Sequence, residues 1–182
     1  FNNLYATFPT VSNIEIKRIF PNQLRIEFDE YDAWGVLCRS APEECFWIDR
    51  AGVAFERAPE FTGTVVPKVR DEREEEFTLG ERRLSPELMR LITFFNERAF
   101  TDNYLQSVEF SIDKKDATLH VRTREGWEIL LFENLDPEES YKNLRITLEN
   151  QVKTEARARE LEYIDLRFGS KIFYKFKEAE AL

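Results

Sequence analysis

Histidine is nearly absent from this sequence, and so are the motifs that mark common catalytic and metal sites. The chain has one histidine, His120, and none of its six glycines belongs to a phosphate-binding loop after a strand. We expect His120 on the exposed face of a strand, so neither a Ser-His-Asp triad nor a histidine-rich metal site is predicted. The paired carboxylates of a glycosidase would come together only in the fold, so the sequence cannot identify them. Glu128, which follows Trp127, is the one acidic residue in an aromatic context suited to binding a sugar. These absences predict a protein that is not an enzyme and that uses no cofactor or metal.

Long apolar runs and basic stripes are also missing. No run approaches the ~20 apolar residues that a membrane-spanning helix needs, and no signal peptide opens the chain. The formal net charge is −9, from 26 Lys and Arg against 35 Asp and Glu. This charge disfavours binding to nucleic acid and electrostatic docking onto anionic lipid. Aromatic residues are plentiful (16 Phe, 6 Tyr and 3 Trp in 182 residues), which predicts a folded chain with a substantial core.

The two cysteines, Cys38 and Cys45, bracket the segment RSAPEE. The residues on both sides, at 34–37 and 46–49, are typical of strands, so the thiols are expected to face each other across a hairpin loop. A disulfide there would stabilise the fold by roughly 2–3 kcal/mol and would imply an oxidising compartment. The alternative is a pair of reduced, half-buried thiols. Two cysteines and one distant histidine do not complete a metal site.

The order of predicted elements indicates an α+β fold. Residues 1–8 are interpreted as the end of a helix, and Ser85 and Asp136 are expected to cap two further helices, each followed by proline. Strands are predicted at 11–20, 24–32, 34–37, 46–49, 53–58, 107–112, 117–123, 127–132, 163–168 and 171–176. Helices are predicted at 85–100 and from 136 through Val152 to the charged TEARARE run, and a charged loop at 59–84. The expected architecture is a mostly antiparallel sheet with helices on one face.

The chain nearly ends on an aromatic hairpin, YIDLRF and KIFYKF around Gly169-Ser170. In the last strand Ile172, Tyr174 and Phe176 alternate with Lys171, Phe173 and Lys175. Such a strand at a sheet edge risks aggregation unless something covers it, and lysines are typical of edges that avoid promiscuous pairing. Three interpretations stay open: the strand pairs on both sides, the final KEAEAL residues cover it, or another protein completes it.

Four short motifs occur in order along the chain. They are a Pro-x-Val, aliphatic, Arg, Pro-x-x-Leu pattern (Pro9, Val11, Ile14, Ile16, Arg18, Pro21, Leu24), an aliphatic-Asp-x-x-Gly-x-x-Phe run (Ile48, Asp49, Gly52, Phe55), a Pro with a following aliphatic (Pro67, Val69), and Tyr-aliphatic-Asp-Leu-Arg-aromatic (Tyr163, Ile164, Asp165, Leu166, Arg167, Phe168). With the order of elements, they resemble the extracytoplasmic region of the bacterial cell-division family FtsQ, called DivIB in some lineages. The family's Glu-Arg-x-Pro stretch is replaced here by Glu30-Tyr-Asp-Ala33, and the cysteine hairpin is not general in the family.

The resemblance implies a division of the chain and a cellular role. Residues 1–33 would be the C-terminal part of a POTRA domain, whose first strand and helix are missing, residues 34–176 a β domain, and residues 177–182 a tail. Members are non-enzymatic, single-pass proteins of the cytoplasmic (inner) membrane, with a transmembrane helix upstream of such a region and this region in the periplasm at the division septum. They bind the small coiled-coil proteins FtsB and FtsL and help to control septal peptidoglycan synthesis.

In the family the partner adds a strand to the edge formed by the last β strand, a recognised mode of peptide binding. Carried over position by position, the expected contact residues are Arg167, Phe168, Ser170, Lys171, Ile172, Phe173, Tyr174 and Phe176. Arg167 would meet a carboxylate of the incoming strand, and Phe168 and Phe176 would be aromatic anchors.

Two other functions compete with this one. A POTRA-bearing module of outer-membrane assembly or secretion machinery would bind unfolded β segments along an edge near residues 13–28. A cell-wall hydrolase would depend on paired carboxylates.

Overall fold

A computed structural model of the protein describes residues 7–40, 43–59, 66–73, 78–105, 108–153 and 160–177. In this part of the chain the strands form a two-stranded and a nine-stranded sheet. The elements are β1 (Val11–Ile19), β2 (Gln23–Glu30), β3 (Gly35–Ser40), β4 (Glu43–Ile48), β5 (Ala54–Arg57), β6 (Lys68–Asp71), α2 (Pro86–Ala99), β7 (Glu109–Ile112), β8 (Leu119–Arg122), β9 (Glu128–Leu131), α3 (Pro137–Thr147), a π-helical turn η1 (Leu148–Val152), β10 (Leu161–Phe168) and β11 (Lys171–Phe176). The predicted α+β class is confirmed.

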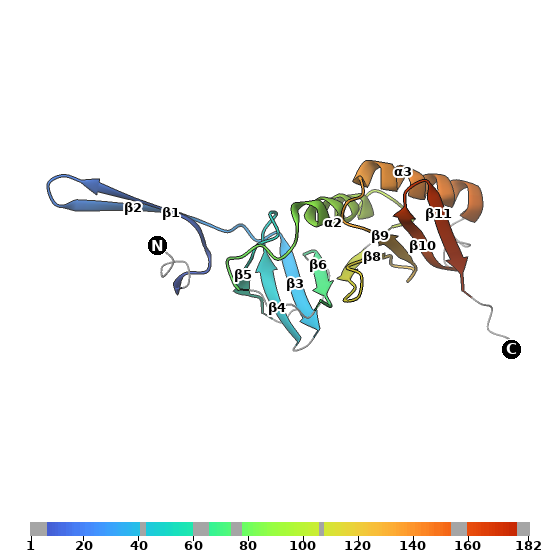
Figure 1. Ribbon diagram of the computed structural model, residues 1–182, viewed down its shortest axis with the longest axis horizontal. Helices are drawn as coiled ribbons and strands as arrows, with labels where there is room; N and C mark the ends of the chain where they lie inside the picture. The colour runs from blue at the N-terminus through green and yellow to red at the C-terminus, as the bar shows by residue number, and fades with distance from the viewer. Residues whose placement is uncertain are drawn as a thin grey trace.

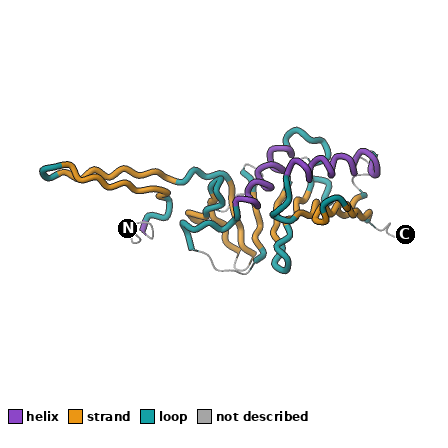
Figure 2. Tube along the Cα trace, turned by 45° about the horizontal axis from the view of Figure 1, so that its top comes forward, coloured by secondary structure: helices purple, strands orange, loops and turns teal. Residues whose placement is uncertain are grey.

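The large sheet has the order β11-β10-β9-β8-β7-β6-β3-β4-β5. Most neighbours are antiparallel, as predicted, but β10·β9, β6·β7 and β3·β6 are parallel. Two of these parallel pairs arise because a helix lies between the strands in sequence: α2 connects β6 to β7, and α3 connects β9 to β10. Both helices lie on one face of the sheet (Figures 1 and 2), which confirms that part of the prediction.

Local sequence accounts for where the two helices begin. The Ser85 hydroxyl accepts a hydrogen bond from the N–H of Leu88 at 3.1 Å, and Asp136 Oδ1 accepts one from the N–H of Glu139 at 2.9 Å. The second helix was expected to continue past Val152. Instead, α3 gives way to η1, and Lys153 adopts a left-handed conformation with φ 67° that ends it; residues 154–159 of the expected helix lie outside the described residues.

The main core lies between the helices and the sheet. The apolar side chains of α2 are buried in it, and Trp127, Phe95 and Leu37 are among its largest fully buried side chains. A buried carboxylate, Asp102, joins the helices, because it accepts hydrogen bonds from the Tyr141 hydroxyl at 2.6 Å and from Arg145 Nη1 at 3.3 Å. Burial and the hydrogen bond to Asp102 raise the pKa of Tyr141 to about 12, so this phenol stays protonated and serves as a structural donor.

One prediction about the 59–84 loop is wrong. Residues 68–71 form β6, which lies between β3 and β7 in the middle of the sheet. The sequence KVRD does not look like a strand, because Val69 is its only apolar residue and the buried position 71 is a charged aspartate. Asp71 is tolerated inside because Arg73 and Arg83 both bond to it, at 2.9 and 2.7 Å. Residues 60–65 and 74–77 of the predicted loop lie outside the described residues.

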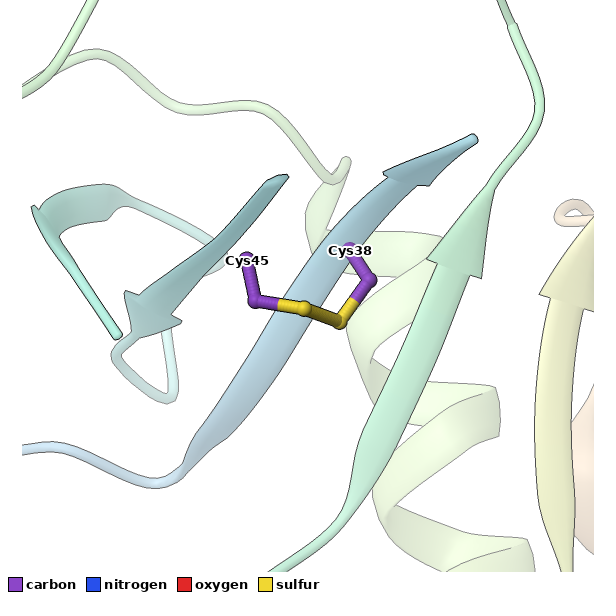
Figure 3. The surroundings of a disulfide bond; sticks show 2 residues. All are labelled: Cys38 and Cys45. Atoms are coloured by element: carbon purple, nitrogen blue, oxygen red, sulfur yellow. A yellow bond between two sulfur atoms is a disulfide. The ribbon is translucent and has the colours of Figure 1, made fainter. Parts of the chain in front are cut away.

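Cys38 and Cys45 form a disulfide, as predicted (Figure 3). The two residues are direct partners across β3 and β4, with a Cα–Cα distance of 4.0 Å. The strands continue beyond them to Ser40 and Glu43, so the bond joins the strands themselves and not the ends of a loop. It belongs to a small apolar cluster with Val36 and Ala58, separate from the main core.

The first two strands form a hairpin that projects away from the large sheet (Figure 1). Its register sets Ile14 against Phe28 and Ile16 against Ile26, so apolar residues face each other at every second position. Leu24, Ile26 and Phe28 are nonetheless 62%, 57% and 60% exposed. Of the helix expected at residues 1–8, Thr7 is helical and residues 1–6 lie outside the described residues. The assignment of this region to a POTRA domain stays a prediction.

Candidate protein-binding edge

Strand β11 forms one end of the nine-stranded sheet (Figure 1), and among the described strands it pairs with β10 alone. The described strands therefore do not support the interpretation in which this strand pairs on both sides. After β11, the N–H of Lys177 still bonds to the Glu160 carbonyl at 2.8 Å, while residues 178–182, the remainder of the tail that was considered as a cover, lie outside the described residues. Within the described chain, β11 thus presents an edge of six residues.

The side chains of β11 alternate between the two faces of the sheet, as predicted. Ile172 and Phe176 pack against the main core, and the Tyr174 hydroxyl donates to Gln151 Oε1 of η1 at 3.2 Å. These three residues therefore face the helices. Lys171, Phe173 and Lys175 lie on the opposite face, where Lys175 Nζ is 2.7 Å from Glu162 Oε2.

Two exposed aromatic rings meet on that opposite face. Phe168, at the end of β10, and Phe173 are 54% and 52% exposed, and their rings lie edge to face with centroids 5.5 Å apart. Phe168 is therefore accessible for the anchoring role expected of it. Phe176, the other expected anchor, already packs against the core, with its ring 5.8 Å from that of Tyr174. The accessible aromatic surface of the edge is thus the Phe168–Phe173 pair together with Tyr174, which is 40% exposed.

Arg167 lies beside this edge but bonds within the chain. Its Nε and Nη2 donate to the two carboxylate oxygens of Asp165 at 2.9 and 2.8 Å. Its Nη1 donates to Asp116 Oδ2 at 3.1 Å and to Thr118 Oγ1 at 3.0 Å. The hydrogen bond to Asp165 raises the pKa of Arg167. The remaining predicted residue, Ser170, is exposed in the turn after Gly169, whose φ of 65° the turn requires.

The only histidine and the carboxylate considered for hydrolysis form one ion-pair cluster on strands β8 and β9. His120 Nδ1 is 2.9 Å from Glu128 Oε2, and Arg122 donates to Glu128 Oε1. His120 is therefore half-buried, and not exposed as predicted, because Glu128 covers it. The hydrogen bond from His120 lowers the pKa of Glu128 from 4.5 to about 2, and the same bond raises the pKa of His120. A carboxylate held ionised in this way is unsuited to act as a general acid.

At the opposite end of the sheet, main chain from residues 80–84 is bonded to the start of β5. The N–H of Ala54 in β5 donates to the Glu81 carbonyl at 3.3 Å, and the N–H of Gly80 donates to the Ala54 carbonyl at 2.8 Å. Val53 forms an isolated bridge with Arg82. The segment at residues 80–84 thus covers the beginning of β5, at residues 52–54, and sequence reasoning missed this cover because the segment contains no strand pattern.

Other kinds of site are not found among the described residues. They contain no group of three or more His, Cys, Asp or Glu side chains that could hold a metal ion. In the same part of the chain, no helix combines the length and the apolar character that crossing a membrane requires.

Comparison with models of known protein families gives no match for this chain. A search of curated proteins also finds no match. The resemblance to the FtsQ and DivIB family therefore rests on the motifs and the order of elements in the sequence.

Proposed function

We propose that this chain is a non-enzymatic extracytoplasmic scaffold that binds another protein by β-strand addition at β11. The observation that carries the proposal is the contrast between the two ends of the sheet: main chain from residues 80–84 is bonded to residues 52–54, where β5 begins, whereas no described strand covers β11. An uncovered edge offers a row of main-chain donors and acceptors to an incoming strand. The resemblance to FtsQ adds the identity of the partners, FtsB-like and FtsL-like division proteins, and the role in controlling septal peptidoglycan synthesis.

The charge of the edge supports a partner with acidic residues. From Leu166 to Lys177 the sequence contains four basic residues and no acidic one, in a chain of net charge −9. An incoming strand would place its side chains directly opposite those of β11. Carboxylates of that strand would therefore meet Lys171, while apolar side chains would meet Tyr174 on the helix face.

The expected affinity is modest. Four new ladder hydrogen bonds at ~1 kcal/mol net each and one or two aromatic anchors at ~2 kcal/mol each act against the entropy lost on association. A dissociation constant on the order of micromolar to high nanomolar follows.

The proposed cellular location is the periplasmic side of the inner membrane, at the septum, with a single transmembrane helix upstream of this region. The Cys38–Cys45 disulfide supports an oxidising compartment. The membrane anchor and the septal location rest on the resemblance alone.

The test is a titration with the extracytoplasmic segment of the source organism's FtsB-like protein. Proline at 173 or 174 removes a main-chain donor, whereas alanine at the same position removes only the side chain. If the edge binds by strand addition, at least one of Phe173→Pro and Tyr174→Pro weakens binding more than its alanine counterpart, in protein that retains its near-ultraviolet circular dichroism. Equal effects of proline and alanine at both positions would count against strand addition.

The hairpin supports a second candidate, the POTRA-bearing module that binds β segments. Among the described residues, β1 and β2 pair only with each other, so each has an outer edge that no described strand covers. Extended peptides from an outer-membrane β protein would bind to this hairpin. Their affinity would not change when proline is introduced into β11. Binding that is lost with Ile16→Pro or Ile26→Pro and kept with both β11 prolines would favour this function.

A further inference from the structure

The motif Tyr163–Phe168 contains an irregularity in the pairing of β10 with β11. Asp165 pairs with Phe173 and Phe168 pairs with Lys171, so Leu166 and Arg167 together oppose the single residue Ile172. This is the arrangement of a β-bulge, in which one strand carries an extra residue and the ladder is interrupted. The bulge lies immediately before the turn that leads into the edge strand.

The Asp165 side chain replaces the interrupted ladder contact. The main-chain N–H of Arg167 donates to Asp165 Oδ1 at 3.1 Å, in addition to the two side-chain bonds between these residues. Asp165 is 5% exposed, so its charge requires such partners. The pair therefore holds the bulge in one conformation through three hydrogen bonds.

Arg167 then connects the bulge to two other places. Through Asp116 and Thr118 it is bonded to the residues between β7 and β8. Its guanidinium carbon lies 5.3 Å from the ring centroid of Phe132 and 5.6 Å from that of Phe168. Phe168 in turn contacts Phe173 on the outer face of β11. A continuous set of contacts thus runs from the β7–β8 turn to the accessible rings of the edge.

The same pair occurs a second time in this sheet. At the end of β6, the N–H of Arg73 donates to Asp71 Oδ1 at 3.1 Å, and Nε and Nη2 of Arg73 donate to the two Asp71 oxygens at 2.9 and 3.0 Å. This copy is bonded to Arg83, which belongs to the segment at residues 80–84 that covers the start of β5. Since β6 is a central strand, the Asp-x-Arg pair has a structural use in this chain that needs no partner protein.

We infer that Arg167 is a positioning residue for the binding edge: with Asp165, Asp116 and Thr118 it fixes the bulge and the Phe168–Phe173 pair, and it does not meet the partner's carboxylate itself. The inference rests on the proposed function for its consequence in binding, but its structural part is independent of any partner.

The structural part is tested on the protein alone by amide hydrogen exchange. Asp116→Asn and Thr118→Val are combined to remove the two outer acceptors of Arg167, and Asp113→Asn removes a similar charge from the same turn without touching Arg167. The double variant should exchange the ladder amides of 171–175 about tenfold faster than the parent, the change expected for loss of about 1.4 kcal/mol of local stability. Exchange unchanged within twofold would overturn the inference.

The binding part uses the FtsB-like segment as probe and compares Arg167→Lys with Arg167→Ala. A lysine keeps the charge but cannot replace the planar fork that bonds Asp165. We expect both variants, and the Asp116→Asn, Thr118→Val double variant, to weaken binding by roughly tenfold, with Asp113→Asn within twofold of the parent. The inference would be overturned in favour of direct contact if Arg167→Lys bound the probe as tightly as the parent and the double variant also kept the parent's affinity.

The two tests separate two kinds of failure. If the parent does not bind the probe and the amides still respond to the double variant, the proposed function fails and the positioning role of Arg167 stands. If the parent binds and the amides do not respond, the positioning role fails and the proposed function stands.

Discussion

The nine-stranded sheet ends in two different ways. At β5, the outer main-chain groups of Ala54 are bonded to residues 80 and 81, and Arg83 and Leu84 both donate to the Gly52 carbonyl, at 2.8 and 3.1 Å. At β11, the longer strand is aromatic and basic, and no described strand covers it. Buried Asp-x-Arg pairs occur in β6 and in β10; the first is bonded to Arg83 of the covering segment, and the second lies beside the edge strand. The comparison teaches that this chain can close an edge with its own backbone, which makes the uncovered edge the place to look for a partner.

The largest effect should come from removing the carboxylate that is bonded to Arg83 of the covering segment. Asp71→Ala leaves two arginines facing a buried position without their partner, at an expected cost of about 3–5 kcal/mol. Asp165→Ala should cost less, about 1–3 kcal/mol, because Arg167 keeps Asp116 and Thr118. Urea unfolding of both variants measures the difference. Equal costs, or a larger cost for Asp165→Ala, would contradict the view that the fold depends more on the Asp-x-Arg pair of β6 than on that of β10.

Glycine substitutions sharpen the same comparison. A Cβ at Gly52, where φ is +81°, would lie 2.4 Å from the Leu84 carbonyl oxygen of the covering segment. Gly52→Ala should therefore cost about 2–4 kcal/mol, from the left-handed backbone and the displaced segment together. Gly169→Ala is the matched control, since φ is +65° with nothing within 4 Å of the new Cβ, and about 1 kcal/mol is expected. Thermal unfolding of the two variants would refute the closed-end geometry if their melting temperatures agreed.

Reduction of the disulfide should weaken the half of the sheet that contains the closed end. A sequence separation of 7 residues between Cys38 and Cys45 gives an expected loss of about 2–3 kcal/mol from loop-closure entropy. Denaturant unfolding with and without reductant measures it, and the Cys38→Ala, Cys45→Ala double variant controls for effects of the reductant itself. If the double variant were as stable as the oxidised parent, the disulfide would not stabilise the fold and the prediction would be wrong.

The smallest effect concerns pH and the half of the sheet nearer β11. Since hydrogen bonding to Glu128 raises the pKa of His120 in the folded protein, its stabilising contribution is present below the ordinary value of about 6.5 and is lost as pH rises through the raised pKa. The groups facing His120 are Glu128, Asp113 and Asp116. Stability should fall by up to about 1 kcal/mol between pH 6 and pH 8.5.

His120→Gln is the control for this pH dependence. Its urea midpoint should change less over the same range than that of the parent, because glutamine does not titrate. The prediction would be wrong if both proteins lost the same stability. At acid pH the Glu128 contribution behaves oppositely: it is present above 4.5 and lost as pH falls towards the folded pKa of about 2.

Local patterns in the sequence identified most elements, because their signals are local in origin. The caps at Ser85 and Asp136, the two-residue loop at Gly169-Ser170 and the period of two in β11 each depend on neighbours a few residues away. The disulfide was also predictable, since two strand-like flanks around a short segment bring the cysteines opposite each other. Strand β6 was missed because its stabilisation comes from distant residues: its central place in the sheet buries Val69, and Arg83 helps to neutralise Asp71.

The candidate site divides in the same way. Sequence alone determined which residues form the last strand, how they alternate and that the strand is basic and aromatic, because pleat and composition are properties of the chain itself. Only the tertiary structure decided that β11 is an edge, that residues 80–84 cover the start of β5, and that Arg167 bonds to Asp165, Asp116 and Thr118. These three facts depend on which segments meet in space, and Arg167 and Asp116 are separated by 51 residues. No local pattern encodes a contact of that range, so the sequence specified the composition of the edge strand, and the fold determined which of its groups are bonded within the chain.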